Sequence, residues 1–338
     1  MLSTGTPVPS LKRQLHSTAN AARKQYKRHA GGTDIGPHAS IVTRSTYACG
    51  IILRRVSFPN TRLYNVTGDH MDATAIILAA GEGTRMKSNH CKVSHKILGK
   101  PMVQWIVDAT IKAGCSRVVV VIGSHADEMR ALIDGAYANS ATKVECVEQT
   151  ERLGTGHAVK VALEACGITQ GPVVVLNGDL PLITADTVAK FAQTVATGEL
   201  ACTVMTMTPP DPFGYGRIKL GADGQIERII EQKDCTPEQA ATLLECNAGC
   251  YAFDGAQLAA HINEIGNDNA QSEYYLPDML EILKGHGQAV SIFHCDDYRD
   301  GLGVNSRIQL AQLTAIARDR INEHWMAEGV TFLSLIHI

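Results

Sequence analysis

From residue 73 onward, short aliphatic segments alternate with segments of helical periodicity, and this alternation restricts the fold more than any other feature. The predicted strands read TAIILAA, RVVVVIG, KVECVEQ and PVVVLNGD. The predicted helices between them read PMVQWIVDATIKAG, DEMRALIDG and TGHAVKVALEA. Residues 118–122 and 173–176 are apolar at every position, as in strands that are buried on both faces. Repeated strand and helix units predict an α/β fold, with a Rossmann-like, mostly parallel mixed sheet covered by helices on both faces.

The pattern changes after residue 200, where predicted strands follow one another without long helices between them. These strands read ACTVMTMT, GRIKL, QIERIIEQK and CNAGCYAF. The connector GADG between the second and the third predicts a hairpin, so we expect an antiparallel lobe beside the parallel sheet. Further along, SEYYLPDMLEILKG predicts an amphipathic helix, VSIFHC a strand and residues 306–328 a long exposed helix. Residues 329–338 have the character of the start of another β element.

The amino-terminal segment differs in composition from the rest of the chain. Residues 1–71 carry ten lysines and arginines and two acidic residues, whereas residues 72–338 carry 21 basic and 32 acidic residues. The first 70 residues also lack the periodicity of a helix or a strand. We therefore expect the folded unit to begin at Met71, after a basic extension that is disordered or not native to the protein. Such an extension is either an organelle transit peptide or an upstream stretch translated from a misassigned start codon, and we favour the second.

Composition bounds the class of protein. A hydrophobic content of 45% with 5% aromatic residues suits a soluble, aliphatic α/β core. The ten cysteines form no CxxC pair, which suits buried, reduced thiols in a cytoplasmic protein. Cys246 and Cys250 are the closest pair, and their strand spacing favours packing over metal binding. The apolar run at residues 48–53 is too short to span a bilayer. We expect neither a membrane nor a nucleic acid as partner.

The run LAAGEGTRMK at residues 78–87 follows the first predicted strand and precedes Lys92. Gly81 and Gly83 remove Cβ atoms where backbone N–H groups approach phosphate oxygens, while Arg85 and Lys92 supply donors and positive charge. The combination predicts a nucleoside triphosphate site. A dinucleotide fingerprint needs a third glycine where Met86 stands, and a phosphate loop needs a Gly-Lys-Ser/Thr end that is missing here. The alternative is an ordinary turn between a strand and a helix.

Two other predicted strands end in polar residues that should reach the same edge of the sheet. LGTGHA places Gly154 and Thr155 at a helix start, where free N–H groups can bind a base edge or a phosphate. Asp179 in LNGDLPL is well placed to bind Mg²⁺, and Asn305 in GVNSR is a second oxygen ligand. The alternatives are a helix N-cap for Thr155 and for Asn305, and a turn aspartate for Asp179.

Over residues 73–333, the chain resembles the amino-terminal half of bacterial bifunctional N-acetylglucosamine-1-phosphate uridyltransferases, in which the same motifs occur in the same order. The motifs that carry the resemblance are LAAGEGTRM, KVSHK, EQTERLGTGHA, LNGDLPL, GYGRI, EQKD, NAG, NDNAQSEYYLPD and GVNSR. The first and the fourth motif indicate a nucleotidyltransferase in general. The others together indicate the sugar phosphate.

The resemblance implies a UDP-N-acetylglucosamine diphosphorylase that joins UTP and N-acetylglucosamine 1-phosphate into UDP-N-acetylglucosamine, for cell-wall and lipopolysaccharide precursors. It implies that Arg85, Lys92 and Asp179 are catalytic, and that Asp179 and Asn305 bind Mg²⁺. The implied substrate contacts are Leu78, Ala79, Ala80, Gly81, Gln149, Gly154 and Thr155 for the nucleotide, Asn177 and Gly178 beside Asp179, and Gly216, Glu231, Asn247 and Asn305 toward the sugar phosphate. Taken alone, Glu231 reads as a solvated strand charge and Asn247 as a turn residue.

The resemblance also sets expectations for domains. Residues 71–305 would be the nucleotidyltransferase domain, with its sugar site in the antiparallel lobe, residues 306–328 a linker helix, and residues 329–338 the start of a left-handed β-helix acetyltransferase domain. The hexapeptide repeats of that domain are missing, so we expect no acetyl transfer. Full-length relatives are homotrimeric, and the sequence leaves the oligomeric state of this chain open.

Several residues depart from the family pattern and keep other functions open. Glu82 stands where lysine is frequent, Cys91 and Ser94 replace the usual proline and leucine around Lys92, Arg152 replaces a glutamine, Asn177 a tyrosine and Ala248 a threonine. One alternative is a nucleotidyltransferase for another sugar 1-phosphate, such as glucose 1-phosphate. Another is a protein that binds nucleotide sugars without turnover.

Overall fold

A computed structural model describes residues 71–221, 224–269 and 271–332. All of these residues belong to one compact unit. The expectations for the extension at residues 1–70 and for residues 333–338 lie outside the described residues. In the described part of the chain, no helix is long and apolar enough to cross a membrane.

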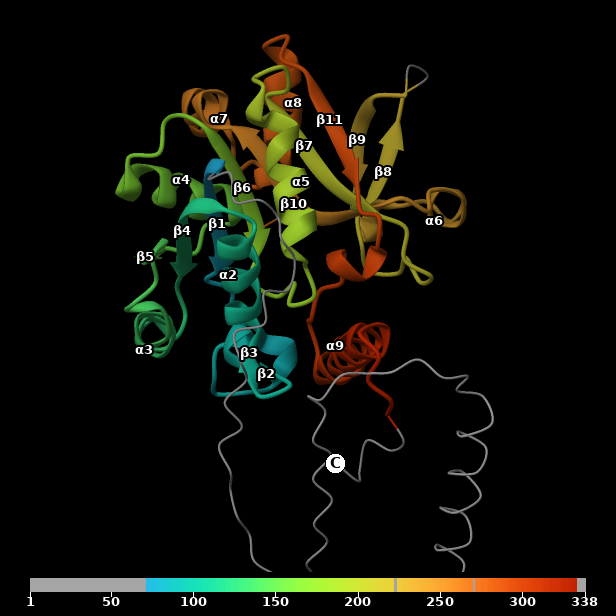
Figure 1. Cartoon of the computed structure of the whole chain (residues 1–338). Helices are drawn as coiled ribbons and strands as arrows, with labels where there is room; N and C mark the ends of the chain where they lie inside the picture. Colours follow the sequence, from blue (N-terminus) through green and yellow to red (C-terminus); the bar gives the residue numbers. More distant parts are fainter. Residues whose placement is uncertain (1–70, 222–223, 270, 333–338) are drawn as a thin grey trace, which may run out of the picture. The chain divides into compact units, whose positions relative to one another are not determined.

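Among the described residues, nine strands form one sheet in which the order is β11-β7-β10-β6-β1-β4-β5, with β8 paired to β10 and β9 to β8 (Figure 1). The strand β1 pairs in parallel with β4 on one side and β6 on the other, whereas β10 runs antiparallel to β6 and β7. The strands are β1 (Met71–Ala79), β4 (Cys115–Ile122), β5 (Lys143–Glu148), β6 (Pro172–Asn177), β7 (Cys202–Met207), β8 (Arg217–Leu220), β9 (Ile226–Ile230), β10 (Cys246–Asp254) and β11 (Val290–His294). The predicted mixed, mostly parallel sheet and the β8–β9 hairpin are confirmed.

Helices cover both faces of this sheet because alternate strand residues point to opposite faces. Ile77 packs in one apolar core with α2, α3 and α5, and its neighbour Ile76 packs in a second core with α4, α7 and α8. Both isoleucines are fully buried. The helices are α2 (Met102–Lys112), α3 (Ala126–Tyr137), α4 (Thr155–Cys166), α5 (Ala185–Ala196), α6 (Pro237–Thr242), α7 (Gly255–His261), α8 (Met279–Gly285) and α9 (Arg307–Ala327).

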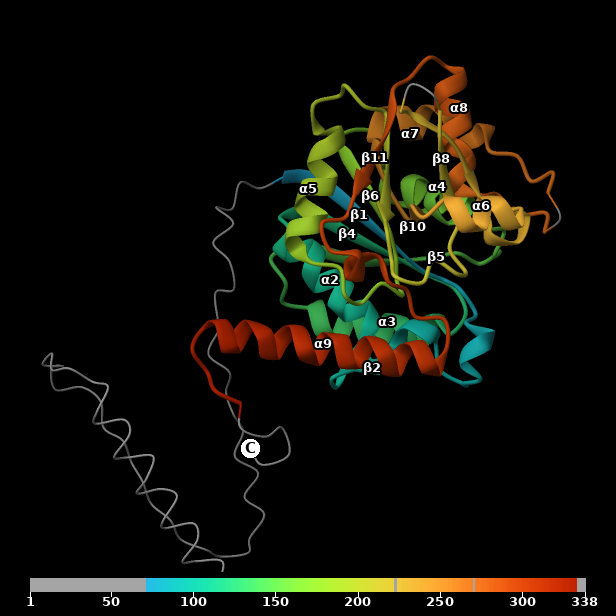
Figure 2. The same ribbon diagram turned by 90° about the vertical axis from the view of Figure 1, so that its right-hand side faces the viewer.

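The last helix, α9, packs beside a small hairpin made by β2 (Lys96–Ile97) and β3 (Lys100–Pro101), as both views show (Figures 1 and 2). Leu313 and Ala317 of α9 are buried against a third apolar cluster. Polar contacts also hold α9, because Arg320 donates to the carbonyl of Leu182 and to the carboxylates of Asp297 and Asp300. One face of α9 packs against the folded core, and the opposite face is exposed to solvent.

The segment SEYYLPDMLEILKG is helical over fewer residues than its periodicity predicts. The helical part begins with the 3₁₀ turn η5 (Leu276–Asp278) and continues in α8. Before it, the N–H of Tyr274 donates to the carbonyl of Leu153, and its carbonyl accepts from the N–H of Gly156. These bonds tie residue 274 to the loop before α4 and to the first turn of α4, so tertiary pairing overrides the local helical pattern.

Acid is expected to weaken the attachment of α9 over a narrow pH range. Burial raises the pKa of Asp297, but hydrogen bonds from Arg299 and the charge of Arg320 outweigh it and bring this pKa from its usual 3.8 to about 2. Because the pKa is lower in the folded state, the stabilisation is complete above about pH 5 and declines as the pH falls toward about 2. Urea unfolding of the wild type and of Asp297→Asn between about pH 6 and about pH 3 measures this stabilisation. The difference between the urea midpoints of the two proteins should shrink as the pH falls. A difference that stays constant would contradict the lowered pKa of Asp297.

Candidate functional site

A cavity of about 770 Å³ opens at the carboxyl ends of β1 and β6, between these strands and the antiparallel lobe. Most of the predicted site residues line it: Leu78, Ala79, Ala80, Gly81, Lys92, Gln149, Gly154, Thr155, Asn177, Asp179, Gly216, Glu231, Asn247 and Asn305. Arg85 and Gly178 do not line the cavity. The guanidinium of Arg85 reaches Asn305, and Gly178 lies behind the lining, where its N–H donates to the carbonyl of Leu78.

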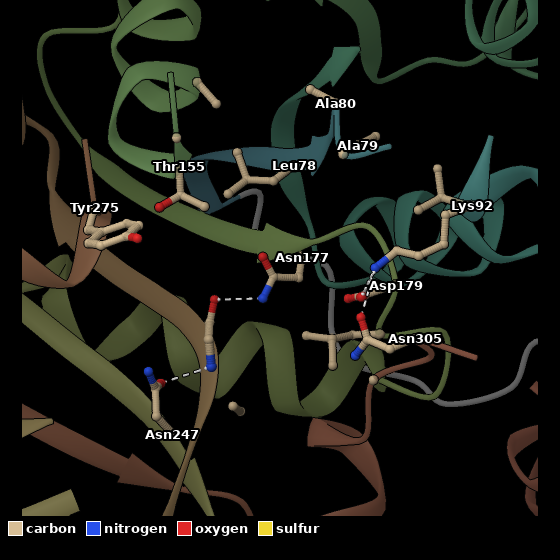
Figure 3. Close-up of a pocket in the computed structure, with 18 of the residues that line it drawn as sticks. Leu78, Ala79, Ala80, Lys92, Thr155, Asn177, Asp179, Asn247, Tyr275 and Asn305 are labelled. Atoms are coloured by element: carbon tan, nitrogen blue, oxygen red, sulfur yellow. Dashed lines mark hydrogen bonds and ion pairs between the residues drawn. The ribbon is translucent and has the colours of Figure 1, made fainter. Parts of the chain in front are cut away.

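Four polar side chains meet at one end of this cavity. The ammonium of Lys92 lies 2.5 Å from Oδ2 of Asp179 and 3.2 Å from Oδ1 of Asn305 (Figure 3). Oδ1 of Asn305 also accepts from Nη2 of Arg85 at 2.9 Å. The side chains of Lys92 and Asp179 are only 16% and 15% exposed, so their ion pair is shielded from bulk water. Two cationic groups and two acceptor oxygens thus lie close together at the edge of the sheet.

Gly83 sets the position of Lys92. Its φ of 62° lies in the left-handed region, and a Cβ at this position would collide with Cβ of Lys92. A side chain at residue 83 would therefore strain the turn and displace the lysine. The glycine turn after β1 thus brings the backbone close to Lys92, while the predicted approach of its N–H groups to phosphate oxygens stays a prediction.

Glu128 of α3 holds the loop that carries Lys92. Its two carboxylate oxygens accept from the backbone N–H of Cys91 at 3.2 Å and from Oγ of Ser94 at 2.8 Å. Burial raises the pKa of Glu128, but the bonds from Ser94 and Cys91 and the nearby His90 outweigh it and leave this pKa below its usual value. The carboxylate is therefore charged at neutral pH. Cys91 and Ser94, which depart from the family pattern beside Lys92, thus both donate to the carboxylate of Glu128.

The oxygens around Lys92 are suited to a divalent cation. Oδ2 of Asp179 and Oδ1 of Asn305 both contact one ammonium group, so a cation already stands between them. Carboxylate and amide oxygens are the protein ligands that Mg²⁺ prefers. The N-cap alternative for Asn305 is wrong, because Ser306 caps α9 while the side chain of Asn305 faces the cavity. The residues present fit the expected Mg²⁺ site, and the ion itself remains a proposal.

A second part of the cavity lies at the start of α4. Thr155 is the first helical residue, and its Oγ accepts the N–H of Leu276 at 3.0 Å. The N-cap alternative for Thr155 is therefore wrong. Gln149 is buried, and its Nε2 donates to the carbonyl of Gly154 at 3.1 Å. Gly154 and Thr155, at the start of α4, line the cavity. The start of a helix can bind an anionic or carbonyl group.

A chain of hydrogen bonds forms the wall on the antiparallel lobe. Nδ2 of Asn177 donates to the carbonyl of Gly249 at 3.1 Å, and the N–H of Gly249 donates to Oδ1 of Asn247 at 2.8 Å (Figure 3). Nδ2 of Asn247 in turn donates to the hydroxyl of Tyr251. Gly249 has a φ of 74°, and a Cβ there would lie 2.5 Å from Nδ2 of Asn177. Asn177 and Asn247 are thus fixed through one glycine.

Other lining residues were not predicted from the sequence. Glu82 and Arg152 form an ion pair at the cavity, and Tyr215, Glu273 and Tyr275 also line it. Tyr215 lies inside the GYGRI motif, and the other two lie inside NDNAQSEYYLPD, so position within these motifs was the available signal. Glu82 and Arg152 are 70 residues apart, and the sequence gives no sign of their contact.

Comparison with known proteins gives one domain family and a set of relatives. Residues 75–233 match the family described as MobA-like NTP transferase domain. The chain is 44% identical over 259 residues to the bifunctional protein GlmU of Shouchella clausii, covering 77% of this chain and 55% of that protein. The GlmU of Exiguobacterium sibiricum is 42% identical over 263 residues, which is 78% of this chain and 57% of that protein. The GlmU of Bacillus subtilis is 39% identical over 259 residues, which is 77% of this chain and 55% of that protein.

The chain spans little more than half the length of these curated relatives. The family match at residues 75–233 includes the ends of β1 and β6, the glycine turn and most of the residues that line the cavity, whereas Asn247, Tyr275 and Asn305 lie outside it. The comparisons therefore confirm the resemblance that the motifs indicated: residues 75–233 match the MobA-like NTP transferase domain, and the chain is similar to bifunctional GlmU proteins over little more than half of their length.

Proposed function

We propose that this protein transfers the uridylyl group of UTP to N-acetylglucosamine 1-phosphate, giving UDP-N-acetylglucosamine and pyrophosphate. The observation that carries the proposal is the contact of the Lys92 ammonium with Asp179 and Asn305, beside Arg85, at one end of the large cavity. The likeness to GlmU proteins and to NTP transferases supports the same reaction. A structural ion pair alone would not need a second cationic group and an open cavity.

In this reaction an oxygen of the sugar phosphate attacks the α-phosphorus of UTP, and the bond from that phosphorus to the bridging oxygen of pyrophosphate breaks. Both reactants are anions, so positive charge must offset their repulsion and stabilise the negative charge on the leaving oxygen. Lys92 and Arg85 supply that charge from fixed positions. Asp179 and Asn305 would hold Mg²⁺, which supplies further charge neutralisation at the phosphates when it is bound. No covalent intermediate with the protein is needed.

Two other regions of the cavity suit the parts of the substrates that carry no phosphate, which are the nucleoside and the sugar. We assign the uracil and ribose to the start of α4 and the end of β1, where Gln149, Gly154 and Thr155 offer amide and hydroxyl groups. We assign the N-acetylglucosamine moiety to the wall formed by Gly216, Asn247 and Glu231. In a cell, the product would serve cell-wall and lipopolysaccharide precursor synthesis in the cytoplasm.

Pyrophosphate release by the purified chain tests the proposal. The assay contains UTP and Mg²⁺ with N-acetylglucosamine 1-phosphate, glucose 1-phosphate or galactose 1-phosphate in parallel. We expect turnover with the first sugar phosphate and loss of turnover when EDTA removes the cation. A preference for glucose 1-phosphate would replace the assigned sugar, and tight binding of UDP-N-acetylglucosamine without turnover would indicate a binding protein.

Glu128 is expected to influence the rate although it does not line the cavity. In Glu128→Ala the loop of Lys92 loses both acceptors, and we expect kcat to fall about ten- to a hundredfold, because small misplacements of a reacting group have effects of this size. Glu128→Gln keeps one acceptor and should lose less. Steady-state kinetics with thermal unfolding as a folding check measures this. An unchanged kcat in a folded Glu128→Ala protein would show that the loop keeps its position without the carboxylate.

A further inference from the structure

A second cluster of ligand-type side chains lies outside the residues that line the cavity. It consists of His261 at the end of α7, Glu264 in the 3₁₀ turn η4 (Ile262–Glu264), and His286 directly after α8. Nδ1 of His261 lies 2.7 Å from Oε1 of Glu264, and Nε2 of His286 lies 2.9 Å from Oε2 of the same carboxylate. The two imidazole rings are 4.1 Å apart. Two histidines from different helices thus converge on one carboxylate.

The chemistry of this cluster differs from that of the Asp179 site. One nitrogen of each histidine and one oxygen of Glu264 all lie within 4.8 Å of one another. Two imidazoles and one carboxylate are a ligand set of zinc sites, in which water occupies the remaining position. Imidazole nitrogen suits Zn²⁺, Co²⁺ and related ions, whereas Mg²⁺ prefers oxygen. The His261, Glu264 and His286 cluster therefore suits a zinc-class ion, whereas the oxygens of Asp179 and Asn305 suit Mg²⁺.

Exposure also suits a metal. The side chain of His261 is 16% exposed, while those of Glu264 and His286 are both 45% exposed. One ligand is anchored in the fold and two are open to solvent, so an ion has a path of entry and room for a water ligand.

We propose that His261, Glu264 and His286 bind one zinc-class divalent cation. The ion would take the place of the hydrogen bonds that now join the three side chains, with both imidazoles neutral. His261 and Glu264 are three residues apart on one helical turn, so they form a local pair, and His286 closes the site from a distance in sequence. This inference is independent of the proposed uridylyl transfer.

The position of the cluster means that a bound ion would restrain part of the cavity wall. The ligands bracket the segment that contributes Glu273 and Tyr275 to the cavity. Within this segment the side chain of Ile265 packs against Gly156, and the carbonyl of Tyr274 accepts the N–H of Gly156 at the start of α4. Binding of an ion would tie residues 261–264 to residue 286 and so restrain both ends of this segment. The restraint would stabilise the wall of the cavity on the side of Thr155.

Cobalt binding to the full chain tests the ligand set. The protein is stripped with a chelator, returned to excess Mg²⁺, and titrated with Co²⁺ while the visible d–d absorption and the protein-bound metal are measured. We expect one Co²⁺ per chain with nitrogen ligation, displaced by Zn²⁺. His286→Ala and Glu264→Gln should each weaken this binding by about a hundredfold or more, since loss of even an indirect partner of a metal ligand costs about ten- to a hundredfold. His294→Ala is the matched control, because His294 is an exposed histidine that also contacts a carboxylate, that of Glu245.

Hydrogen exchange supplies a readout that does not depend on spectra. Zn²⁺ should slow amide exchange in residues 261–269 and 271–286 of the wild type and of His294→Ala, and should have no such effect in His286→Ala. Thermal unfolding without metal shows whether each variant is folded, and Glu264→Gln, which keeps the shape of the side chain, serves if His286→Ala is not. Equal Co²⁺ affinity in the wild type and in either folded ligand variant would overturn the proposal, as would protection by Zn²⁺ in the ligand variants.

Discussion

Replacement of Lys92 by alanine is expected to slow pyrophosphate release about a hundred- to a thousandfold, which is the loss found when one preorganised donor to a developing negative charge is removed. The ammonium is shielded from water and lies against Asp179 and Asn305, so solvent cannot replace its charge at this position. Removal would also leave the carboxylate of Asp179 without its cationic partner. The loss should appear mainly in kcat, because charge accumulates on the leaving oxygen in the transition state.

Two further variants separate charge from geometry. Lys92→Arg keeps a positive charge with different reach and donor geometry, so partial activity is expected. Lys96→Ala removes an exposed lysine of the neighbouring β2 strand and should leave the rate within about twofold of the wild type, as is usual for an exposed charge that makes little net contribution. Wild-type turnover by Lys92→Ala with UTP and N-acetylglucosamine 1-phosphate would remove Lys92 from the mechanism.

The sequence predicted the sheet because its signal is local. The aliphatic run at residues 118–122 and the alternation of Ile76 and Ile77 between two cores are properties of a few neighbouring residues. The same reasoning failed before Leu276, where the hydrogen bonds of Tyr274 with Leu153 and Gly156 hold the chain in a loop. Contacts between distant segments decide such stretches, and helical periodicity alone cannot detect them.

The strand ends also located the cavity, because parallel strands bring their carboxyl ends to one edge. Asp179 and Lys92 could be placed there from the sequence, whereas their distance from Asn305 could not. The departures from the family pattern show the same limit. Glu82 and Arg152 pair with each other, and Cys91 and Ser94 share the carboxylate of Glu128.

These paired departures bear on the alternative of a binding protein without turnover. Random loss of function would not be expected to leave the changed residues in mutual contact beside an intact ion pair of Lys92 and Asp179. Asn177, which replaces a tyrosine, donates to the carbonyl of Gly249 and so remains part of the cavity wall. The departures lie in the walls of the site and in the loop beside Lys92, and they leave the ion pair of Lys92 and Asp179 in place. For this reason catalysis is preferred over binding alone.

Asp300 is the most connected buried carboxylate of the described residues and links three parts of the fold. It lies in the 3₁₀ turn η6 (Tyr298–Gly301) and is 2% exposed. It accepts from the N–H and the hydroxyl of Thr184 at the start of α5, and from the hydroxyl of Thr187. Nη2 of Arg320 in α9 donates to its other oxygen at 2.8 Å. The turn that follows leads directly to Gly303 and Asn305 in the cavity.

Replacement of Asp300 by alanine is expected to lower the free energy of unfolding by about 3 kcal/mol, because Arg320, whose side chain is only 19% exposed, would lose its buried partner and the donors on Thr184 and Thr187 would lose their acceptor. Asp300→Asn keeps one acceptor oxygen without the charge and should fall between this variant and the wild type. Asp296→Ala is the matched control in the same segment, because the Asp296 side chain is 85% exposed and pairs only with an exposed lysine, so its loss should cost less than about 1 kcal/mol. Urea unfolding followed by circular dichroism gives all three values. Equal costs for Asp300→Ala and Asp296→Ala would mean that α9 and α5 are held by apolar packing alone, and that the carboxylate network adds nothing to it.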